Sequence, residues 1–218
     1  ASRAVVVFIN GQYWGLYSLM ERADENFLAS HHAVDPDALD VVENGSEVVE
    51  GDHLAYSELT RECGTSDLAR PEAFESVASR IDLRNFLGYH ISQIYLDNAD
   101  WPTHNTLLWR PHRPDGQWRW ILKDLDATFD LNEYGWDRAT LDVALGLNPE
   151  VAATYPPAVF LPQMLANQEF REEFINGFAD AMNSVFLPSQ FVSRIDSLAL
   201  ALYSEVARHL DRWRGSPY

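Results

Sequence analysis

The sequence predicts an α+β protein in which a β-rich opening precedes a largely helical remainder. Residues 4–9 have the composition of a buried strand, Asn10-Gly11 is a strong hairpin signal, and residues 12–19 form an aromatic-rich return strand. Between Asp82 and Leu96 the apolar residues recur at spacings of three and four, which predicts a central helix. Apolar residues at similar intervals through residues 159–214 predict a helical C-terminal third.

The segments between these elements are shorter and more polar. Asp24 has the position of an N-cap for a short helix, and residues 31–70 predict an irregular insert with one small hairpin around Asn44-Gly45. Helical structure is expected to resume at Pro71. Residues 127–157 are interrupted by glycine and proline, and they predict an ordered surface loop with short helical turns.

A second pair of strands is predicted in the middle of the chain. These strands span residues 106–109 and 117–123 and are joined by a turn rich in proline and charged residues. Because side chains alternate along a strand, Trp118, Trp120 and Leu122 are expected on one face.

Length and composition limit the possible functions. The 218 residues are 46% hydrophobic, enough for one sizeable core, and we expect residues 1–218 to form a single compact domain. No apolar run approaches the length of a membrane span. The net charge of −17 argues against nucleic-acid binding, which needs clustered Lys and Arg. The single cysteine, Cys63, cannot form an internal disulfide and is expected to be an inert thiol in a loop.

Acidic and amide residues follow the central helix in an order typical of phosphoryl-transfer enzymes. Pro102 ends the helix, so Asp100 is expected in a loop, and Asn105 follows it at an Asp-x4-Asn spacing. Asp124 and Asp126 come directly after the predicted hairpin. Kinase-like sites use one Asp to orient the acceptor hydroxyl, and an Asn with a later Asp to bind the metal. The order predicts a catalytic role for Asp100 and metal binding by Asn105 and the two later aspartates, although each residue alone also suits a turn or a strand exit.

Oxygen donors of this kind predict Mg²⁺ or Mn²⁺ as the cofactor, with ATP as the phosphate donor. In a kinase-like fold, the strand leading to the hinge between lobes ends in an acidic residue and precedes a short helix. The start of the chain has this character, which makes Met20, Glu21 and Arg22 candidates for nucleotide binding. An ordinary amphipathic hairpin with a surface Glu21 explains the same pattern equally well. Lys123, the only lysine, is a further nucleotide-binding candidate.

Several longer runs of the sequence resemble the CotH family. They are Val6–Tyr17 continuing through Glu21, Asp24 and Phe27; Asn98–Asn105 with Trp109; Trp120–Asp126 with Phe129; and, in the C-terminal third, Leu165, Asn167, Glu169–Arg171 and Trp213. The resemblance covers nearly the whole chain. It implies an atypical protein-kinase-like fold, made mostly of the helical C-lobe with an N-terminal hairpin from the N-lobe.

The resemblance also implies a function. CotH-like proteins are bacterial kinases, secreted or on spore and cell surfaces, that transfer phosphate from ATP to serine-containing coat proteins. By this resemblance Asp100 is the catalytic-loop acid, and Asn105 with Asp124 or Asp126 binds the metal. Two positions depart from the pattern: Glu43 follows a segment in which relatives often carry a lysine, and Asp130 replaces a common glycine. A nucleotide-contacting cation is therefore expected to be missing or replaced by an arginine.

A kinase-like first lobe needs a phosphate-covering loop and a basic residue ahead of the hinge hairpin, and the sequence begins at that hairpin. We therefore expect the chain to lack part of its N-terminal lobe. Residues 1–218 alone are then expected to bind ATP poorly and to have little activity.

Two other functions fit part of the pattern. A catalytically inactive domain of the same fold could serve surface adhesion or assembly, which the seven tryptophans and the acidic composition also suit. A metal-dependent glycosyltransferase also uses Asp-x-Asp after a hydrophobic strand, but it gives no reason for Asp100 and Asn105 at their spacing. No motif specifies the Ser or Thr hydroxyl of a protein acceptor.

Overall fold

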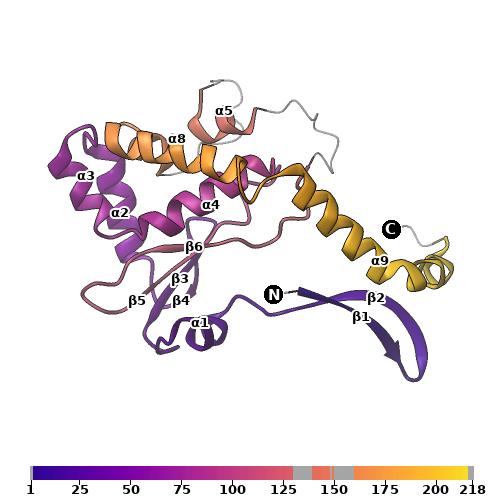
Figure 1. Cartoon of the computed structure of the whole chain (residues 1–218). Coiled ribbons are helices and arrows are strands. Elements are labelled where there is room, and N and C mark those ends of the chain that lie inside the picture. The colour runs from indigo at the N-terminus through magenta and orange to yellow at the C-terminus, as the bar shows by residue number, and fades with distance from the viewer. Residues whose placement is uncertain (1, 130–138, 148, 150–159, 216–218) are drawn as a thin grey trace. The chain divides into compact units, whose positions relative to one another are not determined.

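The computed structural model describes residues 2–129, 139–147, 149 and 160–215 (Figure 1). The chain divides into two compact units, one of residues 1–22 and 180–218 and the other of residues 23–179. The fold class is α+β, as predicted, with helices and small antiparallel sheets. That the two units form a single domain stays a prediction.

A four-stranded antiparallel sheet lies at the centre of the second unit. Its strands are β3 (Leu39–Glu43), β4 (Glu47–Glu50), β5 (Leu107–Pro111) and β6 (Arg119–Ile121), in the order β4-β3-β5-β6. The two hairpins in this sheet match the sequence prediction. Their union was not predicted: β3 pairs with β5, with Val42 opposite Leu108.

The sheet is covered on both faces. On one face, Leu28 of α1 (Glu25–His32) packs with Leu39, Val41 and Trp109. On the other face, Trp120 of β6 meets Phe86 of α4 (Leu83–Tyr95) edge to face, with ring centroids 4.9 Å apart. Burial on both faces explains why β3 lacks the polar–apolar alternation of a half-exposed strand.

The predicted central helix is confirmed as α4. Its N-cap Asp82 accepts a hydrogen bond from the Asn85 N–H at 3.1 Å, and most of its residues from Phe86 to Ile94 are buried. Figure 1 shows α4 between the sheet and α8 (Gln168–Met182), and Phe86 also contacts Phe170 of α8 at 6.0 Å between ring centroids. The helix therefore connects the sheet to the C-terminal helical part of this unit.

Shorter helices complete the second unit. The helix expected from Pro71 is α3 (Pro71–Ala78), and α7 (Leu161–Met164) begins the helical C-terminal third. Among the described residues of the predicted loop 127–157 is the short helix α5 (Thr140–Leu145). Most of the rest of that loop lies outside the described residues.

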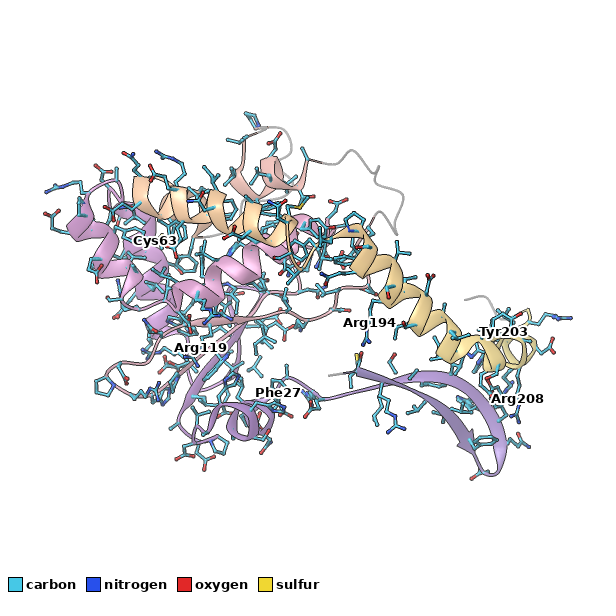
Figure 2. All side chains as sticks on the ribbon, viewed as in Figure 1. Phe27, Cys63, Arg119, Arg194, Tyr203 and Arg208 are labelled. Atoms are coloured by element: carbon cyan, nitrogen blue, oxygen red, sulfur yellow. The ribbon has the colours of Figure 1, made fainter. Side chains whose placement is uncertain are left out.

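The prediction of an irregular insert over residues 31–70 is wrong in its second half. Helix α2 (Leu54–Thr65) lies there and buries Tyr56, Leu59 and Cys63 at helical spacing. Polar residues between these positions and Gly64 near the end obscure the periodicity. Cys63 is therefore on a helix and not in a loop (Figure 2). Burial raises the pKa of its thiol to about 11, consistent with an inert cysteine.

Strand β6 ends earlier than predicted, at Ile121. Trp118 and Trp120 are buried on the expected face, but Leu122 is exposed because it lies beyond the last paired residue. Lys123 consequently lies in the segment between the strand and Asp124, outside the sheet.

His90 is buried in the aromatic core. Its Nδ1 lies 2.8 Å from the Phe86 carbonyl oxygen, and its ring is surrounded by Phe86, Trp101 and Trp120. Burial lowers the pKa of His90 to about 4. The hydrogen bond to the Phe86 carbonyl raises this pKa, but less than burial lowers it. The folded protein therefore keeps His90 neutral under conditions in which the unfolded chain protonates it.

We expect acidification to destabilise the protein through His90. The contribution of neutral His90 to the free energy of unfolding is fully present above the unfolded pKa of about 6.5. It is lost as pH falls toward about 4, by roughly 3 kcal/mol in total. Urea unfolding at pH 7 and pH 5 measures how steeply the free energy of unfolding depends on pH. His90→Gln should flatten it, whereas His53→Gln, at an exposed position, should not. An unchanged slope in His90→Gln would contradict this assignment.

The first unit consists of a β-hairpin and a long helix. Strands β1 (Ser2–Ile9) and β2 (Gln12–Met20) are joined by Asn10 and Gly11, whose φ values of 51° and 78° fit a type I′ turn. The predicted hairpin is confirmed, but the predicted burial of the first strand is wrong. Val6, Phe8 and Ile9 are exposed, because a sheet of only two strands offers little surface on which their side chains can be buried.

Helix α9 (Pro188–Trp213) packs on this hairpin through its C-terminal end. His209 Nδ1 accepts a hydrogen bond from the Leu16 N–H at 3.0 Å, and Trp213 meets Trp14 edge to face at 5.5 Å. The Arg208 guanidinium lies 4.0 Å from the Tyr13 ring centroid (Figure 2). Aromatic and cation–π contacts therefore hold this unit together.

Gly15 is required where α9 meets β2. It has a φ of 143°, and a Cβ at this position would lie 2.9 Å from His209 Nδ1 and 3.0 Å from Trp213 Nε1. We expect Gly15→Ala to destabilise this unit by about 1–3 kcal/mol, because it adds backbone strain to the steric conflict. Thermal unfolding followed by tryptophan fluorescence measures the change. Gly64→Ala, where a Cβ meets nothing within 4 Å, is the matched control; equal stability of the two variants would contradict the close-approach argument.

Candidate active site

Two loops of the second unit carry the predicted site residues and are hydrogen-bonded to each other. One follows α4 and contains Asp100; the other follows β6 and contains Asp124 and Asp126. The Ala99 N–H donates to the Ala127 carbonyl oxygen at 2.8 Å, and the Phe129 N–H donates to the Leu96 carbonyl oxygen at 2.9 Å. These two bonds bring together segments that are almost 30 positions apart in the chain.

Buried amides anchor the Asp100 loop. The side-chain oxygen of Asn98 accepts a hydrogen bond from the Asp100 N–H at 3.2 Å, and its Nδ2 donates to Gln93 Oε1 at 2.9 Å. Asn98 and Gln93 are both fully buried. Sequence analysis did not identify either residue, although Asn98 in the run Asp-Asn-Ala-Asp has the typical position of a side chain that caps a turn.

Asn105 returns toward Asp100 at the end of the same loop. Its Nδ2 lies 3.4 Å from Asp100 Oδ2, and its backbone is left-handed, with a φ of 59°. The His104 N–H donates to the Asp100 carbonyl oxygen at 2.9 Å, which closes the intervening turn. The Asp-x4-Asn spacing therefore places both side chains together.

Asp124 lies close to two other carboxylates. Its pKa is raised, first by burial, then by the charge of Asp126 and a hydrogen bond with it, and further by the charge of Asp100; Lys123 opposes the shift. Asp124 also has a left-handed backbone, with a φ of 49°. The charges of Asp126 and Asp100 thus both act on Asp124.

Lys123 makes an ion pair with Glu43 at the end of β3. Glu43 is one of the two positions that depart from the CotH-like pattern, and the ion pair places a cation beside it. Lys123 was predicted to bind nucleotide; in the structure its ammonium already has a protein partner. It is also close enough to lower the pKa of Asp124.

A model of the CotH kinase protein family matches residues 1–217. The chain belongs to the CotH family. No curated protein matches it. Among the described residues, no helix is both long and apolar enough to cross a membrane. Membership agrees with the resemblance found in the sequence, and the α+β architecture is compatible with it.

The other predicted nucleotide-binding residues of this CotH chain belong to the first unit. Met20 ends β2 with 67% of its surface exposed, and Glu21 and Arg22 follow it as exposed residues. Met20, Glu21 and Arg22 therefore belong to a different unit from the Asp100 loop. Their role in nucleotide binding stays a prediction.

The donor atoms of the CotH site suit a hard divalent cation. Asn105, Asp124 and Asp126 offer amide and carboxylate oxygens, and Mg²⁺ is usually held by one or two carboxylates together with phosphates and water. Among the described residues, no three His, Cys, Asp or Glu side chains are close enough to form a complete metal cage. The residues therefore fit an ion that is shared with bound phosphates better than an ion that is held by protein alone.

Proposed function

We propose that this CotH chain carries the catalytic and metal-binding residues for ATP-dependent phosphate transfer to Ser or Thr hydroxyls of a protein acceptor. The observation that supports this most strongly is the pair of hydrogen bonds between the Asp100 loop and the Asp124 loop. They bring the Asp-x4-Asn pair next to the Asp-Leu-Asp triplet, which is the arrangement that kinase-like chemistry requires. An atypical kinase-like fold is part of this proposal.

Each residue has a distinct role in the proposed reaction. The Asp100 carboxylate orients the acceptor hydroxyl and accepts its proton as the oxygen attacks the γ-phosphorus. The bond from that phosphorus to the β–γ bridging oxygen breaks, and ADP leaves. Asn105, Asp124 and Asp126 would hold Mg²⁺ or Mn²⁺, which neutralises charge on the phosphates when bound. Asn98 keeps the Asp100 backbone in position through its buried hydrogen bonds.

The surrounding charges agree with these roles. The charges of Asp126 and Asp100 disfavour the ionised form of Asp124, and a divalent cation would relieve that repulsion. Nucleotide binding by Met20, Glu21 and Arg22, predicted from the kinase-like character of the opening hairpin, belongs to the same proposal. So does a location on the cell or spore surface, which the CotH resemblance implies.

The direct test measures transfer from γ-labelled ATP to the protein itself and to casein, with Mg²⁺ or Mn²⁺ present. We expect labelling by residues 1–218 to be weak but cation-dependent, and Asp100→Asn to reduce it by about 100-fold or more. Asp142→Asn removes the same charge from an exposed position on α5 and should leave labelling unchanged. Equal labelling by wild type and Asp100→Asn would refute the assigned role.

A further inference from the structure

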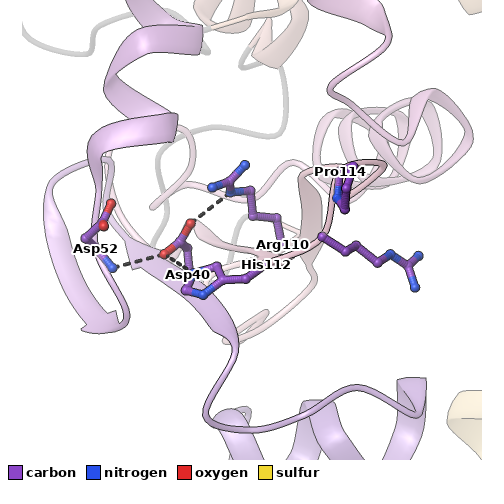
Figure 3. A pocket seen from close by; sticks show the side chains of 6 residues that line it. Asp40, Asp52, Arg110, His112 and Pro114 are labelled. Carbon is purple, nitrogen blue, oxygen red and sulfur yellow. Dashed lines mark hydrogen bonds and ion pairs between the residues drawn. The ribbon is translucent and has the colours of Figure 1, made fainter.

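A polar pocket of about 480 Å³ lies on the second unit between the turn after β4 and the turn joining β5 to β6 (Figure 3). It is lined by Asp40, Asp52, Arg110, His112, Arg113 and Pro114. None of these residues belongs to the candidate active site. The pocket therefore needs its own explanation.

A buried carboxylate forms the base of this pocket. Asp40 is 1% exposed and accepts hydrogen bonds from Arg110 Nε at 2.8 Å and from the Asp52 N–H at 3.0 Å. His112 Nε2 lies 2.7 Å from Asp40 Oδ1, the oxygen that also accepts from the Asp52 N–H. The close approach depends on Gly51, since a Cβ there would lie 2.5 Å from Asp40 Oδ1. Asp40 thus fixes the positions of two basic side chains that remain partly exposed.

The pocket has more hydrogen-bond donors than acceptors. A guanidinium donates from Nε and from both terminal nitrogens, yet only Nε of Arg110 and of Arg113 is engaged, with Asp40 and Asp115. Within the described part of the chain, the terminal nitrogens have no hydrogen-bond acceptor. The Asp52 carboxylate is partly satisfied because its Oδ1 accepts from the Leu54 N–H at 2.8 Å. The pocket therefore suits a ligand rich in acceptor oxygens.

The Arg110 donors are also held in place before any ligand arrives. Its Nε is fixed by the buried Asp40, and its guanidinium carbon lies 5.6 Å from the Trp118 ring centroid. Such preorganisation lowers the entropy lost on binding. Because the whole chain carries a net charge of −17, its long-range field repels anions, and binding must depend on these short-range donors.

We propose that this pocket binds a phosphate ester. A guanidinium matches phosphate oxygens with paired hydrogen bonds, and Arg110 and Arg113 both line the pocket. The volume exceeds that of a phosphate alone, so the pocket also accommodates the group that the phosphate esterifies. The inference depends only on the geometry of this pocket and not on the proposed transfer reaction.

Titration of the protein with inorganic phosphate, O-phosphoserine and a phosphoserine peptide tests the site, by calorimetry without nucleotide or metal. We expect saturable binding that Arg113→Gln weakens about tenfold, while serine and the unphosphorylated peptide do not bind. Arg84→Gln removes the same charge from an exposed position on α4 and should bind as wild type does. Asp115→Asn should tighten binding, because it frees Arg113.

The ranking of the probes identifies the source of the phosphate. Tighter binding of the phosphoserine peptide indicates a phosphorylated protein, and tighter binding of inorganic phosphate or phosphoserine indicates a small molecule. Either ranking supports the site if Arg113→Gln weakens binding of the phosphate probes. Absence of saturable binding by all three phosphates, or equal affinity of Arg113→Gln and wild type, would overturn the proposal and leave Asp40 with a structural role alone.

Discussion

Replacing Asp124 by asparagine is expected to weaken Mn²⁺ binding by about tenfold or more and to reduce phosphate transfer by about 100-fold or more. Asparagine keeps the size and one side-chain oxygen but removes the negative charge. The change removes the carboxylate on which the charges of Asp126 and Asp100 act, and a divalent cation gains most of its binding energy from charged oxygens. The effect should therefore exceed that of an ordinary surface substitution.

Paramagnetic resonance of Mn²⁺, with and without ATP, measures binding separately from transfer. Asp142→Asn serves as the control of equal charge on an exposed helix position. If Asp124→Asn binds Mn²⁺ and transfers phosphate as wild type does, the Asp-Leu-Asp triplet is only a polar strand exit. That result would favour the non-catalytic adhesion or assembly function considered for this family member.

The candidate site could be predicted from sequence because its parts obey local rules. Asp and Asn favour the turns in which Asp100 and Asn105 lie, although α4 already ends at Tyr95, several residues before Pro102. The exit of a short strand places Asp124 in a loop for similar reasons. Each of these inferences depends on neighbours within a few residues, and the structure agrees with them.

Interactions between distant segments could not be predicted in the same way. The β3–β5 pairing joins residues more than 60 positions apart, and the residues of neither strand indicate which other strand it pairs with. The Lys123–Glu43 ion pair follows from that pairing, so a residue predicted to bind nucleotide has a protein partner that its neighbours in the chain do not indicate. Helix α2 was missed for a different reason, since polar residues dilute its periodicity.

The buried ion pair between Asp40 and Arg110 shows the same dependence on distant contacts, and removing it is expected to destabilise the protein strongly. Burial alone would raise the pKa of Asp40, but the Asp52 N–H, His112 and Arg110 outweigh burial and lower it. Asp40→Ala leaves Arg110 and His112 without their shared acceptor. We expect a loss of about 3 kcal/mol at pH 7, the lower end for broken buried pairs, because 27% of the Arg110 side chain still reaches water.

Urea unfolding of Asp40→Ala beside Asp115→Ala separates a buried pair from an exposed one. Asp115 pairs with Arg113, but the two side chains are 81% and 52% exposed, so its removal should change stability by less than about 1 kcal/mol. The lowered pKa of Asp40 means that its contribution is present above the usual Asp range and is lost as pH falls through the folded pKa. The difference between wild type and Asp40→Ala should therefore shrink below about pH 4. A small effect of Asp40→Ala at pH 7 would mean that water replaces the lost carboxylate, and that Asp40 does not fix the Arg110 side chain at the pocket.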